Sequence, residues 1–125
     1  MRYVVQVLIV GIHHVSLNVT DTERSLGLYR DTLGLAVLPR PDFSFKGAWL
    51  DAGNGHQVHL IEAEHVAPNL GQHVSFGVTD LEAVLVSLRD AGVEVSASKS
   101  VGGTEIRQAF MLDPDGNLLE ITQPE

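Results

Sequence analysis

GIHHVSLNVTD (Gly11–Asp21) and GQHVSFGVTD (Gly71–Asp80) share the pattern His-Val-Ser-x-x-Val-Thr-Asp with the same internal spacing. An offset of 59 residues pairs His14 with His73. Two copies at so long a period do not suit a solenoid and indicate instead that one supersecondary unit is duplicated. The same offset continues the match past the quoted stretches, pairing Glu23 with Glu82, Leu26 with Leu85, Arg30 with Arg89 and Asp31 with Asp90.

Each copy is expected to form a strand, a helix and three further strands. The strict alternation in HVSLNV and HVSFGV is typical of a half-buried strand, with valines on one face and histidine and serine on the other. Thr20–Glu23 and Thr79–Glu82 have the pattern of capping boxes, which begin helices. Gly34 and Gly92 are expected to end these helices, after about Leu33 and Ala91. The other strands are expected near Leu35–Leu38, Phe45–Asp51, Gln57–Glu62, Val93–Ala97, Thr104–Leu112 and Leu118–Thr122.

This order predicts an α+β fold of two βαβββ units related by pseudo-two-fold symmetry, in a single domain spanning residues 1–125. The first unit covers about residues 11–62, the linker about 63–71 and the second unit about 72–123. Helices should cover the valine faces of two curved sheets. The opposite faces, which carry the histidines, should then form a metal-binding cup.

Composition excludes several classes of protein. With 44% apolar and 19% charged residues, the chain is globular rather than disordered. It has no cysteine, so any metal site must use His, Asp or Glu, and the cytoplasm is the expected location. A net charge of -8 argues against nucleic acid and acidic membranes as partners. The apolar segment Val4–Ile12 is too short to span a bilayer, and we expect it to form or lead into the first strand.

Four residues are candidate metal ligands. His14 and His73 open the two copies, while His59 and Glu120 occupy matching positions on the last strand of each unit. The two-fold relation allows all four side chains to converge on one point, and imidazoles with a carboxylate suit Zn, Ni, Co, Mn or Fe(II). A buried Glu120 also needs a positive partner, and no Lys or Arg lies near it in sequence. We therefore expect one divalent metal ion per site, with Zn or Ni favoured.

Structural roles compete with this interpretation. A single buried histidine is more often a hydrogen-bonded core residue than a ligand, and the symmetry of position is what favours metal here. His13, His56 and His65 lack that symmetry and are not expected to be ligands. Residues expected on the cup face, where they would bind substrate, are Ser16, Asn18, Gln57, Ser75, Trp49, Arg107 and Phe110, although core packing is an equal alternative for Trp49 and Phe110.

The chain resembles the vicinal oxygen chelate superfamily, which includes glyoxalase I, fosfomycin-resistance proteins, extradiol dioxygenases and bleomycin-binding proteins. The resemblance spans Gly11 to Thr122 and is strongest in the two repeats and in FMLDPDGNLLEI. It implies metal ligands at the same four positions, and a homodimer in which each site is often shared between the halves of two chains. Glyoxalase I usually has glutamate at the His59 position, and an arginine where this chain has Asn18.

The favoured interpretation is a metal-dependent glyoxalase-like lyase or isomerase. Its small substrate would chelate the metal through vicinal oxygens, and Glu120 would be the general base that removes a proton from the α-carbon. One alternative is an Fe(II) extradiol ring-cleaving dioxygenase, which needs two histidines and one glutamate. The other is a ligand-sequestering resistance protein without catalysis.

Overall fold

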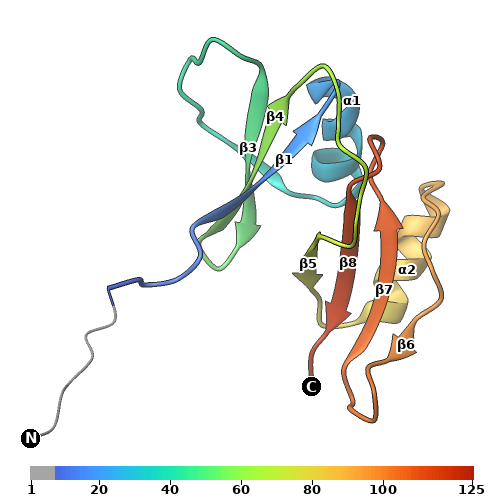
Figure 1. The fold of residues 1–125 in the computed structure, drawn as a ribbon. Helices are drawn as coiled ribbons and strands as arrows, with labels where there is room; N and C mark the ends of the chain where they lie inside the picture. The colour runs from blue at the N-terminus through green and yellow to red at the C-terminus, as the bar shows by residue number, and fades with distance from the viewer. Residues whose placement is uncertain (1–7) are drawn as a thin grey trace, which may run out of the picture.

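The structure is a computed structural model that describes residues 8–125, and it contains two four-stranded sheets (Figure 1). No helix in this part of the chain is long and apolar enough to cross a membrane. The elements, in chain order, are β1 His14–Val19, α1 Thr22–Leu26, η1 Gly27–Thr32, β2 Ala36–Leu38, β3 Gly47–Gly53, β4 His56–Glu62, β5 His73–Gly77, α2 Leu81–Asp90, β6 Lys99–Ser100, β7 Arg107–Leu112 and β8 Leu118–Gln123.

The two sheets have the same topology, which confirms the predicted pair of βαβββ units. Their strand orders are β1-β4-β3-β2 and β5-β8-β7-β6. In each, the first strand pairs in parallel with the last, and the remaining neighbours are antiparallel. A parallel pair needs a crossover connection, and the helix of each unit lies in that crossover.

Both helices begin one residue later than the capping-box pattern predicts. Asp21 is the N-cap of α1, where its carboxylate accepts from the Arg24 backbone N–H at 3.1 Å. Asp80 caps α2 in the same way, through the Ala83 N–H. Threonine does not cap the first helix because the hydroxyl of Thr20 is bound elsewhere, to Asp115.

The first helix widens into a π-helix, η1, over its second half. This segment carries Tyr29, whose ring is fully buried and whose hydroxyl donates to Asp113 at 2.7 Å. Burial, together with the negative charge of Asp113, raises the pKa of Tyr29 far above its ordinary value. The phenol therefore stays a neutral donor at any physiological pH.

The second strand of the second unit differs from expectation. Only an isolated bridge, between Val95 and Met111, forms within the predicted strand Val93–Ala97, and β6 lies further along the chain. The reason is that the Ser96 hydroxyl accepts from the Phe110 N–H at 2.9 Å, in place of a backbone carbonyl. This side-chain bond interrupts the regular ladder.

The core lies between the helices and the valine faces of the sheets, as predicted. Alternate residues of β3, β4, β7 and β8 are buried there, while most residues of the opposite faces are only partly buried. We call these opposite faces the cup faces. The most completely buried side chains are Tyr29, Leu50, Leu60, Leu81, Leu85, Leu119, Val19, Val58 and Ser25.

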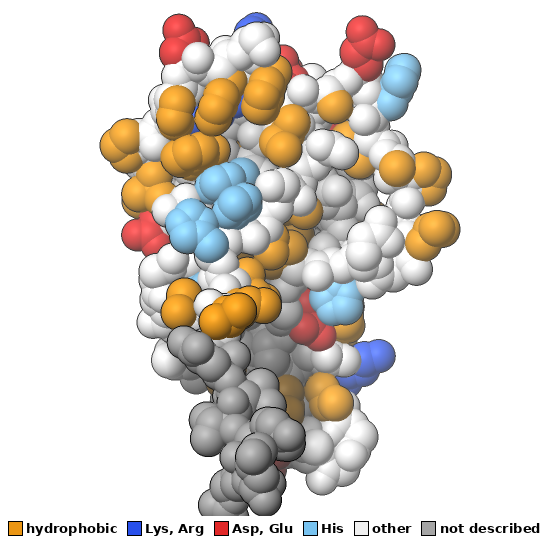
Figure 2. Space-filling model, turned by 60° about the vertical axis from the view of Figure 1, so that its left-hand side comes forward, with side chains coloured by type: hydrophobic (Ala, Val, Ile, Leu, Met, Phe, Trp, Pro, Cys, Tyr) orange, Lys and Arg blue, Asp and Glu red, His pale blue; other side chains and the backbone are white. Residues whose placement is uncertain are grey.

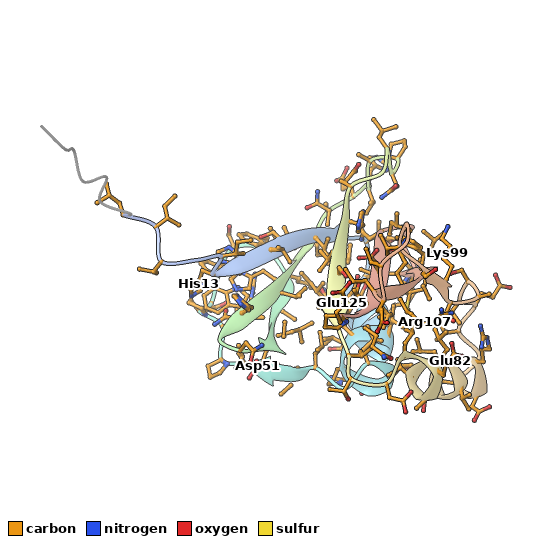
Figure 3. The ribbon with its side chains drawn as sticks, turned by 90° about the horizontal axis from the view of Figure 1, so that it is seen from below. His13, Asp51, Glu82, Lys99, Arg107 and Glu125 are labelled. Atoms are coloured by element: carbon orange, nitrogen blue, oxygen red, sulfur yellow. The ribbon has the colours of Figure 1, made fainter. Side chains whose placement is uncertain are left out.

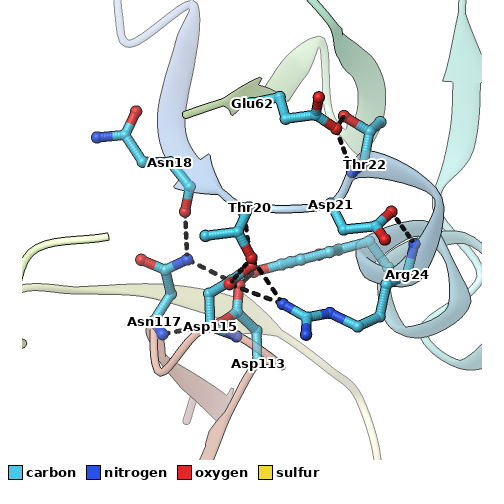
Figure 4. Close-up of polar contacts among 10 residues, drawn as sticks. Asn18, Thr20, Asp21, Thr22, Arg24, Glu62, Asp113, Asp115 and Asn117 are labelled. Carbon is cyan, nitrogen blue, oxygen red and sulfur yellow. Dashed lines mark hydrogen bonds and ion pairs between the residues drawn. The ribbon is translucent and has the colours of Figure 1, made fainter. Parts of the chain in front are cut away.

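The two units meet through the β7–β8 turn and through the edge strands β1 and β5. Figure 4 shows Asp115 bound to Thr20 and to Arg24, and Asn117 donating to the Asn18 carbonyl at 2.9 Å. The Arg24–Asp115 ion pair measures 2.8 Å, and the Asp115 side chain is only 5% exposed. Residues of β1 and β5 together line cavities of about 230 and 310 Å³, so these two edges face one another.

The apolar segment before β1 is described only in part. Residues 1–7 lie outside the described part of the chain, and the strand expectation for them stays a prediction. Residues 8–13 have no regular secondary structure, and Leu8, Ile9, Val10 and Ile12 are exposed.

A pair of glycine substitutions tests the close packing of β3 on β4. A Cβ at Gly47 would overlap the backbone carbonyl of Leu60, whereas one at Gly27 meets nothing within 4 Å. We expect Gly47→Ala to lower the free energy of unfolding by about 2 kcal/mol or more. Gly27→Ala, in helical backbone, should leave it unchanged or raise it by up to about 1 kcal/mol. Urea unfolding of both variants measures this, and equal effects would contradict the packing.

The Asp115 contact predicts a pH-dependent stability. Burial tends to raise the pKa of Asp115, but hydrogen bonds from Thr20 and the charge of Arg24 outweigh it and hold that pKa below the ordinary 3.8. The carboxylate therefore stabilises the fold at neutral pH, and this contribution is lost as the pH falls through the lowered pKa.

We expect Asp115→Asn to lower the free energy of unfolding at pH 7 by about 1.5–3 kcal/mol. The difference from wild type should disappear at pH values well below 3.8, which urea unfolding at several pH values would show. Asp31→Asn is the matched control, because Asp31 forms an exposed ion pair and should change stability little. A difference for Asp115→Asn that is constant with pH would contradict the role of its charge.

Candidate functional site

The chain places its four candidate ligands in two pairs, one on each sheet. His14 and His59 lie on β1 and β4, with ring centroids 3.9 Å apart and planes 16° apart. His73 and Glu120 occupy the equivalent diagonal positions on β5 and β8. Within residues 8–125, no three histidine or carboxylate side chains form a group that could hold a metal ion. Each sheet of one chain therefore carries half of the predicted ligand set.

His59 is the buried member of the first pair. Its side chain is 7% exposed, and the indole of Trp49 stacks on it at 4.5 Å with planes 7° apart. Its Nε2 lies 2.8 Å from the Gln57 side-chain oxygen. Burial lowers the pKa of His59, and the positive charges of His14, His13 and Arg40 lower it further. The imidazole is therefore held neutral, the form that binds a metal ion.

The first pair fits a metal ion chemically. His14 Nδ1 lies 2.9 Å from His13 Nδ1, and His59 Nε2 is paired with Gln57. Within the described residues no hydrogen bond occupies the other nitrogen of either His14 or His59, so each ring keeps one free donor atom. A ligand histidine usually has its second nitrogen bound in this way, because that bond fixes the tautomer.

The second pair is held by hydroxyl groups. Thr122 donates to Glu120 Oε2 at 2.9 Å, and its Oγ1 lies 2.5 Å from the Ser75 hydroxyl. His73 Nδ1 lies 2.8 Å from the Gly71 carbonyl, and its ring meets Phe110 edge to face at 5.8 Å. These contacts orient an imidazole and a carboxylate on the cup face of the second sheet.

Most of the residues predicted to bind substrate lie beside one pair or the other. Trp49 and Gln57 contact His59, Phe110 contacts His73, and Ser75 belongs to the chain of hydroxyls that reaches Glu120. Ser16 and Asn18 are exposed on β1, and Ser16 pairs with His59 in the ladder.

Arg107 lies apart from both pairs. It pairs with Gln123, whose side chain binds the N-terminus of α2, and its own guanidinium donates to Ser98 at 2.8 Å. It therefore faces the helix side of the sheet, next to Glu82 and Lys99 and away from His13 (Figure 3). The structure shows no contact between Arg107 and the cup face.

Two features were missed by the sequence reasoning. Thr122 follows Glu120 by two residues, and the alternation of the strand places it on the same face, but its hydrogen bond to Glu120 was not predicted. Phe43 and Phe45 lie in RPDFSFKG, between β2 and β3, where two aromatic residues in a polar loop are an unusual signal. Their rings stack at 5.3 Å, and Phe43 also lies 6.0 Å from Trp49.

A cavity of considerable size lies away from both pairs. It measures about 670 Å³, lies between η1, residues 92–96 and β7, and is lined by none of the four candidate ligands. Its walls are mostly apolar, with Leu28, Val95 and Met111 among them. It does not bear on the chemistry of the candidate ligands.

Duplicated βαβββ units with histidine on the first strand and a ligand-type residue on the last define a vicinal-oxygen-chelate class of fold. The family model described as the Glyoxalase/Bleomycin resistance protein/Dioxygenase superfamily matches residues 11–121. The chain belongs to this superfamily.

Individual relatives agree with this assignment. The chain is 31% identical to Glyoxylase I 4 of Arabidopsis thaliana over 121 residues, which cover 89% of this chain and 69% of the relative. It is 30% identical to the lactoylglutathione lyase of Haemophilus influenzae over 127 residues, covering 90% and 91%. The crystal structure of a glyoxalase family protein of Bacillus anthracis matches with a TM-score of 0.82 at 23% identity, covering 100% of both chains, and shows the fold.

Proposed function

We propose that this protein is a metal-dependent glyoxalase-like lyase or isomerase whose active site forms between two copies of the chain. His14 and His59 of one copy would meet His73 and Glu120 of the other, and the resulting four donors would hold one divalent ion. The observation that carries the proposal is that the two halves of the ligand set lie on separate cup faces of one chain, with His14 and His73 exposed to solvent. A second copy with two-fold symmetry supplies the missing half to each.

The roles of the side chains follow from their contacts. A bound divalent cation would supply Lewis-acid polarisation of a substrate with vicinal oxygens. Glu120 would take the proton from the adjacent carbon, because Oε2 is held by Thr122 and no hydrogen bond within the described residues occupies Oε1. Ser16 and Asn18 offer exposed polar groups that would orient the substrate. Trp49 would exclude water from the His59 side of the site.

Metal dependence is the first test. Chelation should abolish isomerisation of 2-oxoaldehyde–thiol adducts, and Ni, Co or Zn should restore it. Trp49 is the one tryptophan of the chain and stacks on His59, so Ni²⁺ or Co²⁺ should quench its fluorescence. We expect His59→Ala to weaken metal binding by at least about 100-fold, since the loss of an outer partner alone costs 10–100-fold.

His65→Ala is the control for this experiment, because His65 is exposed in the segment between β4 and β5. Isomerase activity that survives complete chelation would contradict the proposal. Oxygen uptake on catechols after anaerobic loading with Fe(II), without isomerase activity, would assign the ring-cleaving reaction instead.

Mixing of inactive variants tests whether the site is shared. His14→Ala and Glu120→Ala should each abolish activity in a pure dimer. In a mixed dimer, however, the intact His14 half of one chain meets the intact Glu120 half of the other. Unfolding and refolding an equal mixture should therefore restore about a quarter of wild-type activity, because half of the dimers carry one intact site out of two.

His14→Ala mixed with His59→Ala is the matched control, since both changes damage the same half of the ligand set. That mixture should stay inactive. Failure of the first mixture to recover, with both variants folded and dimeric, would place the whole site within one chain.

A further inference from the structure

The loop between β2 and β3, residues 39–46, carries two exposed aromatic rings. Phe43 is 40% exposed and Phe45 is 44% exposed. Their rings are nearly parallel, 7° apart, with centroids separated by 5.3 Å. Large apolar side chains held in this way keep an aromatic surface available to solvent and to a ligand.

A series of ring contacts links these two phenylalanines to the first pair of candidate ligands. The Phe43 ring lies 6.0 Å from that of Trp49, with the two planes tilted by 50°, and Trp49 stacks on His59 at 4.5 Å. His59 in turn stacks on His14. Figure 2 shows histidine side chains gathered beside hydrophobic side chains on one face of the molecule. We call Phe43, Phe45 and Trp49 the aromatic shelf.

Arg40 holds the shelf in place. Its guanidinium carbon lies 4.7 Å from the Phe43 ring centroid and 5.1 Å from that of Phe45. The same group donates to the Phe45 carbonyl at 2.9 Å, and Gly47 allows the loop to return close against Leu60. Because these contacts already order the rings, a ligand that stacks on them has little loop entropy to overcome.

We propose that the aromatic shelf binds a planar aromatic group of the substrate, so that the preferred substrates are aryl compounds with vicinal oxygens. This proposal rests on the proposed function, because the vicinal oxygens are placed at the His14 and His59 end of the shelf. Offset or edge-to-face contact between rings adds to the effect of apolar burial. A methyl group in place of the aryl group cannot span from His59 to Phe43.

A second copy of the chain is the competing occupant of this surface. Charged side chains surround the two phenylalanines, since Arg40, Asp42 and Lys46 lie in or beside the same loop. The core of a protein interface is depleted of charge, whereas a small-molecule site combines an apolar wall with a few polar groups. The continuity of the shelf with His59 also favours a small ligand.

The test compares mandelate with lactate, two 2-hydroxy acids that differ only in phenyl against methyl. Binding is followed by fluorescence of Trp49, the one tryptophan, with and without Zn²⁺. We expect mandelate to bind wild type about tenfold more tightly than lactate, given the strength of a ring contact. The double variant Phe43→Leu/Phe45→Leu should reduce this ratio to near one and leave lactate affinity unchanged.

Two further variants make the test specific. Arg40→Gln should reduce the ratio partly, because the rings lose the group that orients them. Val86→Ala, at an exposed apolar position of α2, should leave the ratio unchanged. Sedimentation of each variant reports on the oligomeric state.

The outcomes separate this inference from the proposed function. If mandelate binds tenfold more tightly than lactate but Zn²⁺ changes the affinity for neither, the result would support the aromatic shelf and contradict the metal site. A ratio near one in wild type, or one that the double variant leaves unchanged, would overturn the shelf whatever Zn²⁺ does. A double variant that loses its dimer and shows no change in ratio would assign the surface to a second copy, which also overturns the inference.

Discussion

Hydrogen bonds from the β7–β8 turn to the first unit fix the relative orientation of the two βαβββ units. Asp115 binds Thr20 and Arg24 at the start of α1, while Asp113 binds the buried hydroxyl of Tyr29. A carboxylate removed from water needs such partners, so these bonds fix the position of the turn against the first unit. With the turn bound in this place, the edge strands β1 and β5 face one another and line shared cavities.

One chain holds its candidate ligands as two pairs, one on each cup face. Each pair occupies diagonal positions on a parallel strand pair, as expected of duplicated units. The pairs are not chemically equal: His59 is buried beneath Trp49 and kept neutral, whereas Glu120 is held by a hydroxyl of Thr122. Neutral imidazole on one face and an oriented carboxylate on the other are complementary, which is why we propose that two chains complete one site.

The regular elements could be predicted because their signals are local. Alternation in HVSLNV and HVSFGV assigned both opening strands and their buried faces, and Gly34 and Gly92 marked where the helical segments end. The predicted helix starts and the predicted strand at residues 93–97 were wrong where a side chain forms a hydrogen bond that the adjacent sequence does not indicate. The Thr20 hydroxyl donates to Asp115 instead of capping the helix. The Ser96 hydroxyl accepts from the Phe110 N–H, where a backbone carbonyl would accept in a regular strand pair. Both bonds join residues distant in sequence.

The sequence by itself determined the duplicated βαβββ topology and the face of each strand that carries His14, His73 and Glu120, because periodicity and repeat spacing are properties of neighbouring residues. The superfamily followed from the resemblance of its motifs to a known family. Only the tertiary structure decided that these side chains lie in separate pairs and that Arg107 faces the helix side. It also decided that ring contacts link the loop before β3 to His59. Those features depend on how two sheets and a loop are oriented in space, which no local pattern encodes.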